Sequence, residues 1–252
     1  MRQFKLWNAS KTQAFDFATN GCIITDVSGL GLGFNVSLVN RAVVDYESKF
    51  ENITLLANFG IKSNAYTSFN EFANFIASNG RKNLILEYAV NGKTVYCDVW
   101  IKNIPKSQKT TFNILAEKLE FVRLTYWYQI ESGVLPTYPS VINIENGVME
   151  DILVNLTVSG PTSDTFKVAL IYGSTVLSEI KLNVVLTLDH VLEIDADNKN
   201  VKLINSGIES NGYNLIDHSK DTFIVVPSGA HGLSIYAGTG TVTYSFKKWV
   251  ID

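Results

Sequence analysis

The chain has little of the chemistry that marks secreted domains and most enzymes. Its 252 residues include two cysteines, three histidines and only 18% charged residues. Cys22 and Cys97 cannot form a disulfide framework, and no Cys/His spacing matches a zinc site. The N-terminus lacks the apolar run of a secretory signal, and no window approaches the roughly 18 apolar residues of a membrane span. We therefore expect a chain made in a reducing cytosol, with both thiols free and no membrane segment.

Motifs for catalysis and for ligand binding are also missing. His190, His218 and His231 have no local partners that would mark a nucleophile–base pair or a metal cluster. The segment 195–200 begins like a calcium loop but lacks the glycine at the sixth position and the glutamate at the twelfth. The glycines of 29–33 precede an extended segment rather than a helix, which argues against a phosphate-binding loop. The sequence thus predicts no catalytic residue, no cofactor and no metal.

What the chain does have is apolar and aromatic surface. Hydrophobic residues make up 46% of it and aromatic residues 12%, which is too apolar for a disordered chain. The net charge of −3 argues against electrostatic binding to nucleic acid or membrane by the whole chain. Residues 1–130 hold 14 Lys and Arg against 10 Asp and Glu, whereas residues 131–252 hold 7 against 14. Pro136 and Pro139 lie between these halves, so 131–147 is predicted to be a linker between domains 1–130 and 148–252.

Strand signals dominate both halves. Short β-branched and aromatic runs, separated by glycine and asparagine, predict a mainly β fold with a β-sandwich in the second half. Asn91-Gly92 lies between two such runs, Leu84–Tyr88 and Thr94–Ile101, and predicts a tight hairpin. The strands expected in the second half are 151–158, 166–172, 176–182, 184–188, 191–194, 201–204, 223–226 and 241–246.

One helix is expected, over residues 68–79. Ser68 and Glu71 have the spacing of a capping box, in which each side chain binds the backbone amide of the other residue. Asn79-Gly80 supplies the left-handed stop. The apolar residues at helical spacing are Phe69, Phe72, Phe75 and Ile76. This aromatic stripe is typical of core packing against a sheet.

The segment Gly29–Phe50 fits no regular element cleanly. Phe34, Val36 and Leu38 alternate with polar residues, but charged residues then interrupt the pattern. About twenty residues without a clean element are unusual inside a compact domain. Two interpretations stay open: an arm that pairs with a neighbouring subunit, and a mobile surface hairpin.

A few aromatic residues could contact a ligand. Tyr126-Trp127-Tyr128 and Trp249 could stack on sugar rings or nucleobases, although strand-end aromatics are more often buried. Trp249 is retained as a sugar-stacking candidate.

The order of these features along the chain resembles one known family. The N-terminal part contains, in order, 2-RQFKLW-7, 16-DFATNG-21, 29-GLGLG-33, the predicted helix, 84-LILEY-88 and 121-FVRLTYWY-128. Over residues 1–130 this series resembles the N-terminal domain of siphophage distal tail proteins, the Dit family. Leu192–Asp195, Phe223–Gly229 and Thr241–Trp249 resemble that family's second domain, a galectin-like or carbohydrate-module-like sandwich.

The resemblance implies a structural role in the virion. It implies a tail-tube-like N-terminal domain, a split β-barrel or two-sheet structure with one packed helix, that forms a homo-hexameric ring. The ring would join the tail-tube protein to the tail-tip adhesion protein, and possible further partners are receptor-binding and baseplate proteins. DNA would be present only in transit. The candidate inter-subunit arm residues are Phe34, Val36, Leu38, Arg41, Val43 and Tyr46.

Two other functions remain alternatives. The chain could be a carbohydrate-binding adhesion protein whose C-terminal sandwich recognises a host cell-wall polysaccharide, because fold alone does not settle function. It could also be a tail-tube subunit, but a separate acidic C-terminal domain argues against that. An enzyme is the least favoured class, because no site is marked.

Overall fold

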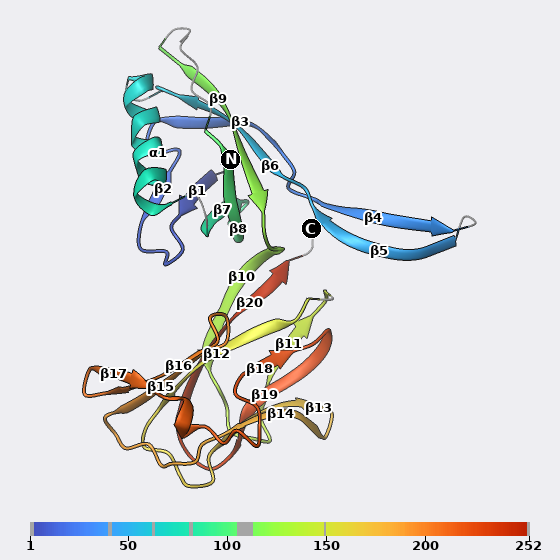
Figure 1. Ribbon diagram of the computed structural model, residues 1–252, viewed down its shortest axis with the longest axis vertical. Coiled ribbons are helices and arrows are strands. Elements are labelled where there is room, and N and C mark those ends of the chain that lie inside the picture. Colours follow the sequence, from blue (N-terminus) through green and yellow to red (C-terminus); the bar gives the residue numbers. More distant parts are fainter. Residues whose placement is uncertain are drawn as a thin grey trace. The chain divides into compact units, whose positions relative to one another are not determined.

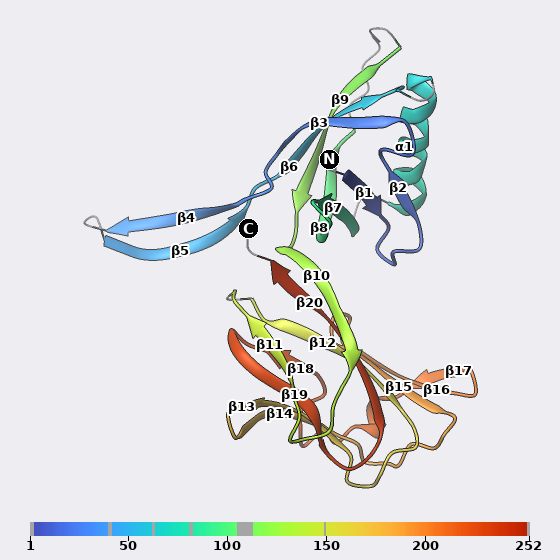
Figure 2. The same ribbon diagram turned by 180° about the vertical axis from the view of Figure 1, so that it is seen from behind.

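The computed structural model describes residues 3–39, 42–61, 64–80, 83–104, 113–148 and 150–250, and leaves the side chains of 32–39 and 42–49 undescribed. The chain divides into two compact units (Figures 1 and 2). The N-terminal unit comprises Met1–Tyr128 with Val250–Asp252, and the C-terminal unit comprises Gln129–Trp249. Strands dominate both units, and the described residues contain one α-helix. The prediction of a mainly β fold is therefore confirmed.

The strands of the N-terminal unit pair in one antiparallel series, β3-β6-β9-β8-β7-β1-β2. Their bounds are β1 Gln3–Trp7, β2 Ala14–Asp16, β3 Cys22–Ser28, β6 Ile53–Phe59, β7 Leu84–Val90, β8 Lys93–Asn103 and β9 Leu115–Arg123. Within the described residues β2 and β3 end the series without pairing with each other, so the sheet does not close.

The hairpin predicted at Asn91-Gly92 is confirmed. Val90 pairs with Lys93, so the loop between β7 and β8 has two residues. Asn91 has φ +50° and Gly92 has φ +78°. Asparagine and glycine are the residues that best tolerate these left-handed conformations, and this turn matches the right-handed twist of the strands.

The helix α1 spans Ala65–Asn79 and begins earlier than predicted. Asn64 is its N-cap, because the Asn64 side chain accepts a hydrogen bond of 3.0 Å from the Tyr66 amide. Ser68 is fully buried inside the helix, so the predicted capping box at Ser68 is wrong. The apolar period extends back to Ala65, which gives the helix one more buried turn. The predicted stop is confirmed: the helix ends at Asn79, and Gly80 has φ +79°.

The core of the N-terminal unit is rich in aromatic rings. Phe72 of α1 is fully buried, and its ring lies 5.2 Å from that of Phe15 and 5.9 Å from that of Phe59, centroid to centroid. Both cysteines belong to this core, and neither forms a disulfide. Burial raises the pKa of Cys22 to about 12 and that of Cys97 to about 11, so both stay neutral thiols near neutral pH.

Strands β4 (Leu32–Val39) and β5 (Ala42–Phe50) form a separate two-stranded sheet. Figures 1 and 2 show them running out from the sheet of the N-terminal unit. They pair from Leu32 with Phe50 to Val39 with Ala42, and the register shifts after Ser37. We call this hairpin, residues 32–50, the arm.

The C-terminal unit is built from two antiparallel sheets. The first has the order β17-β16-β15-β12-β20-β10, and β18 also pairs with β12. Its bounds are β10 Trp127–Val134, β12 Ile152–Ser159, β15 His190–Asp195, β16 Asn200–Asn205, β17 Ile208–Asn211, β18 Ile224–Val226 and β20 Thr241–Val250. The second has the order β11-β19-β13-β14, with β11 Ile142–Asn146, β13 Lys167–Tyr172, β14 Thr175–Lys181 and β19 Gly229–Ala237. A short 3₁₀ helix, η1, spans Tyr213–Leu215.

The apolar residues of this unit form a core of their own. Phe166, Leu170 and Leu233 are fully buried members of it. Along β12 buried and half-buried residues alternate, which is the pattern of a strand with one face in the core.

Three local predictions in the second half are wrong. The expected linker 131–147 contains the end of β10 and all of β11. The expected strand 184–188 is a loop, because Leu186 exchanges hydrogen bonds with Thr162 instead of joining a ladder. Strand β19 was not expected, because Gly229 and Gly232 weaken the strand pattern of its sequence.

Candidate functional site

The first candidate site is the place where the arm leaves the sheet, which we call the arm root: Gly29–Gly31, Phe50 and Asn52. Gly29 has φ +78°, and a Cβ atom there would lie 2.0 Å from the Asn52 carbonyl oxygen. Only glycine allows the two chain segments to approach this closely. The close approach is confined to Gly29 of the two, because a Cβ at Gly31 would meet nothing within 4 Å.

Two side chains of the sheet hold the arm root by its carbonyl groups. Arg123 Nη1 donates hydrogen bonds to the carbonyl oxygens of Leu30 (3.1 Å) and Gly31 (2.9 Å). Trp127 Nε1 donates to the Leu30 carbonyl oxygen at 2.8 Å. Arg123 is only 4% exposed, so water cannot replace these bonds easily.

Aromatic rings complete the arm root. The guanidinium carbon of Arg123 lies 5.1 Å from the ring centre of Phe50 and 5.3 Å from that of Trp127. The Phe50 ring also packs edge-on against Tyr126, with 5.0 Å between centroids. Burial lowers the pKa of Arg123 from its usual value, and the ring faces and carbonyl oxygens offer the negative potential that a buried guanidinium needs. The arm is thus fixed to the sheet at its root.

The predicted arm residues lie in the two strands of the arm. Phe34, Val36 and Leu38 belong to β4, and Val43 and Tyr46 belong to β5. Arg41 lies outside the described residues. The contact role predicted for these residues remains a prediction. Tyr126, Trp127 and Tyr128 are buried, so they are core residues rather than exposed stacking residues.

No local sequence pattern indicates the role of Arg123. It lies more than 90 residues from the carbonyl groups that it binds. The nearest sequence feature is the run of glycines that begins at Gly29, where two backbone segments approach closely.

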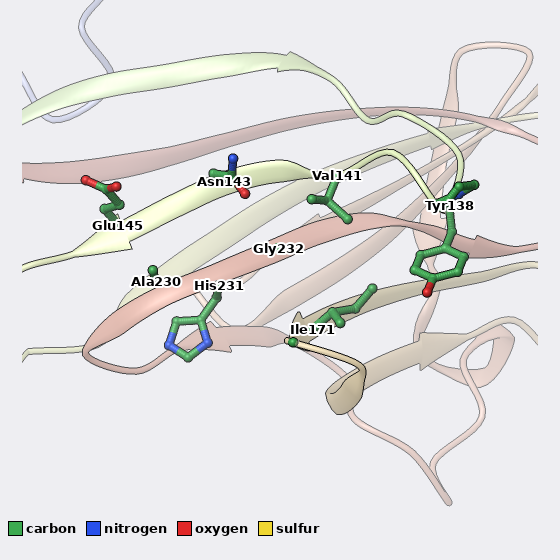
Figure 3. A pocket seen from close by; sticks show the side chains of 10 residues that line it. Tyr138, Val141, Asn143, Glu145, Ile171, Ala230, His231 and Gly232 are labelled. Atoms are coloured by element: carbon green, nitrogen blue, oxygen red, sulfur yellow. The ribbon is translucent and has the colours of Figure 1, made fainter.

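The second candidate site is a hollow of about 360 Å³ in the C-terminal unit, at one end of the sheet β11-β19-β13-β14 (Figure 3). Its lining residues are Tyr138, Pro139, Val141, Asn143, Glu145, Ile171, Gly173, Ala230, His231 and Gly232. We call it the sandwich hollow.

Strand pairing determines which side chains share a face of this sheet. Asn143 pairs with Gly232, and Glu145 pairs with Ala230, so these residues share one face. His231 pairs with Ile144, whose side chain is in the core. Figure 3 shows Asn143 and Glu145 on one side of β11 and the His231 imidazole on the opposite side of β19.

His231 is therefore a residue of the core side of the sheet. It is 7% exposed, its Nε2 lies 3.3 Å from the Ser228 carbonyl oxygen, and its ring centre lies 5.7 Å from that of Tyr172. The three histidines lie in different places, and no group of three or more His, Cys, Asp or Glu side chains in the described ranges could hold a metal ion.

Trp249 lies elsewhere, in β20. It is half-buried and packs against the core of the C-terminal unit. Its role in sugar stacking stays a prediction.

The other polar constellations form turns and surface ion pairs. Asp217 accepts hydrogen bonds from the Ser219 amide and hydroxyl and pairs with Lys181 at 3.1 Å. The Ser219 bonds, together with Lys181, lower the pKa of Asp217 to about 2. Residues 196–199 form the turn between β15 and β16, whose ends Asp195 and Asn200 pair with each other. No helix in the described part of the chain is long and apolar enough to cross a membrane.

Comparison with known proteins identifies the N-terminal unit. A family model described as "Distal tail protein, N-terminal domain" matches residues 3–124. No curated protein matches the chain.

Solved structures share the fold along nearly the whole chain. A chain of the phage P2 baseplate in its activated conformation with Ca is 16% identical, with 99% of both chains covered and a TM-score of 0.69. The same baseplate with Sr gives 15% identity, 99% coverage of both chains and a TM-score of 0.68. The SPP1 Dit protein gives 12% identity, coverage of 98% of this chain and 99% of that one, and a TM-score of 0.61. Residues 3–124 of this chain therefore match the N-terminal domain of the distal tail protein (Dit) family.

Proposed function

We propose that this chain is a structural hub protein at the distal end of a phage tail. Copies of it, six in the closed form, make a ring that joins the tail-tube protein to the tail-tip adhesion protein. Receptor-binding and baseplate proteins are further partners. The match of residues 3–124 to the distal tail protein N-terminal domain supports this proposal. So does the shared fold with the P2 baseplate chain and with SPP1 Dit, which is described as a paradigm of the hub adsorption apparatus in phages that infect Gram-positive bacteria.

The single observation that carries the ring is the arm. Its two strands pair with each other, and neither pairs with any other described strand. An isolated two-stranded hairpin is marginally stable in water, and its unpaired edges are templates for another strand. A second copy of the chain can supply that strand. Because the contact is head-to-tail, repetition closes into a ring when the rotation between copies allows it.

The arm root suits this role. Arg123 and Trp127 fix the first residues of the arm on the sheet, so the arm leaves each copy in a defined direction. A defined direction reduces the conformational entropy that is lost on docking. Phe34, Val36, Leu38, Arg41, Val43 and Tyr46 are the residues that we assign to the contact.

The ring has no turnover chemistry and holds DNA only in transit. A bore lined by Lys and Arg would retain DNA through phosphate contacts. The excess of Lys and Arg in residues 1–130 is therefore expected on inter-subunit or outer surfaces. A continuous basic lining in an imaged ring would contradict this.

Deletion of residues 35–48 tests the assembly role. The deletion keeps the arm root, so the N-terminal unit should fold while ring formation is lost. The measurement is particle mass, by light scattering and electron microscopy, after co-expression with the tail-tube and tail-tip proteins of the same phage. Ile208→Ser, at an exposed position of the C-terminal unit, is the control and should assemble normally. A full-sized ring from the deletion variant would refute the proposal.

A second candidate function is recognition of a host cell-wall polysaccharide by the C-terminal unit. The sandwich hollow supports it, because its volume falls within the range of about 300–1,000 Å³ that small-molecule sites have. Calorimetric titration of the full chain with cell-wall polysaccharide from the host tests it. A pure docking unit would give no heat that depends on the sugar.

A further inference from the structure

The first sheet of the C-terminal unit has an open edge at β10. On one side β10 pairs with β20. On the other side β8 pairs with β10 at Tyr128, before the C-terminal unit begins at Gln129. Within the described residues no strand pairs with this second side of Gln129–Val134, so these six residues leave one side of their backbone without a partner strand. We call this segment the β10 edge.

The hydrogen bond of Leu135 shows which backbone groups face outward from the β10 edge. The Leu135 amide donates a hydrogen bond of 2.8 Å to the Val242 carbonyl oxygen of β20. Successive residues of a strand point their N–H and C=O groups to opposite sides. Half-buried and exposed residues alternate regularly from residue 129 to residue 134, so no bulge interrupts this order. The N–H and C=O groups of Ile130, Ser132 and Val134 therefore point away from β20.

The exposed side chains of the β10 edge are largely apolar. Ile130 is 50% exposed and Val134 is 63% exposed, with Ser132 between them on the same face. Glu131 is the one charged residue of the segment, and it pairs with Lys248 at 3.2 Å. Native proteins protect open edges with charges, bulges, short strands or a covering segment, because such edges bind other strands. The β10 edge has none of these protections.

Other sheet edges of the chain are protected. β3 has a bulge, and its exposed Asp26 carboxylate accepts a hydrogen bond from the Val27 amide. β2, β17 and β18 have three or four residues each. The amides of Asp217 and Asp221 donate to carbonyl oxygens of β14 and cover part of its edge. β11 has five residues and exposes Glu145. Among the described strands outside the arm, the β10 edge is the longest without protection.

The arm of a second copy offers the strand that this edge lacks. β4 and β5 pair with no described strand outside the arm. The sequence of β5 has three charged residues, whereas β4 has apolar residues at every second position, Phe34, Val36 and Leu38. Apolar residues at this spacing match the face of the β10 edge on which Ile130 and Val134 lie, because cross-strand neighbours on one face also recur at every second residue.

From these features we propose that the β10 edge binds strand β4 of the arm from the neighbouring copy. β4 joins the sheet β17-β16-β15-β12-β20-β10 as an added strand. The outward N–H and C=O groups of Ile130, Ser132 and Val134 pair with the free side of β4, and its apolar residues cover Ile130 and Val134. This proposal rests on the ring function above and names the surface of one copy that receives the arm of the next.

Ser132→Pro tests the edge directly. Proline removes the outward amide of residue 132 and leaves the amides that face β20, which is the position that an edge strand tolerates. Ser132→Ala is the matched control, because it keeps the amide and removes only the hydroxyl group. Each full chain is co-expressed with the tail-tube and tail-tip proteins of the same phage, and particle mass is measured by light scattering and electron microscopy. The proline variant should give at least tenfold fewer full-sized rings, and the alanine variant should assemble normally.

Disulfide capture tests the same contact without blocking it. Each full chain carries Val36→Cys together with one cysteine in the edge: Ile130→Cys, Ser132→Cys or Val134→Cys. The co-expressed assemblies are oxidised with glutathione disulfide and separated on non-reducing gels. Both native cysteines are buried, which limits their background. At least one pair should link copies to each other, whereas Val36→Cys with the exposed Ile208→Cys should link none.

The outcomes separate the β10 edge from the ring function on which it rests. Fewer rings from Ser132→Pro, with hydrogen-exchange protection of β12 retained, and disulfide-linked copies support the proposal. Full-sized rings from Ser132→Pro, or rings in which no edge cysteine links to Val36→Cys, overturn it, while loss of rings on deletion of residues 35–48 keeps the arm function. Full-sized rings from the deletion variant overturn both. If Ser132→Pro loses the protection of β12, the disulfide result alone decides.

Discussion

The two units of the chain are both antiparallel β structures, but they use their strands differently. The N-terminal unit puts two of its strands, β4 and β5, outside its main sheet, and holds their root with the buried Arg123. The C-terminal unit keeps its strands in two sheets and leaves exposed polar and aromatic groups on one face. A unit with unpaired strand edges is suited to assembly, and a unit with a lined hollow is suited to recognition.

The cores of the two units share no residue, which makes this contrast testable. Hydrogen exchange can be measured on peptides from each unit within the intact chain. A change in one unit should alter protection there and leave the other unit as it was.

The largest expected effect follows the substitution Phe72→Ala. Phe72 is fully buried on the core face of α1 and packs near several aromatic rings, so its removal leaves a cavity in the N-terminal core. The cost is about 3–5 kcal/mol of unfolding free energy. Hydrogen exchange should show lost protection in the N-terminal unit only. An equal loss in both units would mean that they fold as one.

Next comes Arg123→Met, which keeps the volume of the side chain but removes the donors at the arm root. The carbonyl groups of Leu30 and Gly31 then lose a charged partner in a buried place. We expect a loss of about 2–3 kcal/mol in urea unfolding. Ring assembly should also weaken, because the arm no longer leaves the sheet in a fixed direction. Full assembly by this variant would show that the arm root is structural only.

Alkaline pH should affect the N-terminal unit through its thiols. Burial raises the pKa of Cys22 to about 12 and of Cys97 to about 11, whereas an unfolded thiol titrates near 9. Below pH 9 both states carry the proton, so stability is unaffected. Above pH 9 the unfolded state alone loses protons, and the unfolding free energy falls by about 1 kcal/mol per thiol at pH 10.

Urea unfolding at pH 7.5 and pH 10 measures this effect. The double variant Cys22→Ala with Cys97→Ala is the control, because it removes the thiols and keeps every other titrating group. Its loss between the two pH values should be smaller than that of the parent chain. Identical losses would mean that the thiols do not contribute.

The smallest effect is expected for Gly29→Ala. The residue would have φ +78°, and its Cβ would clash with the Asn52 carbonyl oxygen. We expect a cost of about 1–2 kcal/mol in thermal or urea unfolding. Gly31→Ala is the matched control two residues away, because a Cβ there meets nothing within 4 Å. Equal effects of the two substitutions would contradict the close approach at the arm root.

Sequence patterns predicted the local structure better than the sites. The hairpin at Asn91-Gly92 and the end of α1 at Gly80 depend on a few neighbouring residues, so a short pattern specifies them. The start of α1 was misplaced because Asn64 and Ser68 are both good caps, and only packing of Ala65 in the core decides between them.

The sites depend on residues that are distant in sequence. Arg123 contacts the carbonyl groups of Leu30 and Gly31 in the folded sheet, in which β9 pairs with β6. A local sequence pattern cannot predict such a contact. The hollow was missed because it lies on β11 and β19. Pro136 and Pro139 made the segment that contains β11 resemble a linker, and Gly229 and Gly232 weakened the strand pattern of β19.

One irregularity of the arm has a consequence for how copies could align. Ser37 pairs with Asp45 but Leu38 pairs with Val43, so Val44 is an extra residue without a partner across the hairpin. Sliding one strand past the other by a single step would have to carry this bulge along. The alignment of the two strands of the arm is therefore fixed, and a strand that pairs with the edge of the arm meets the same alignment in every copy.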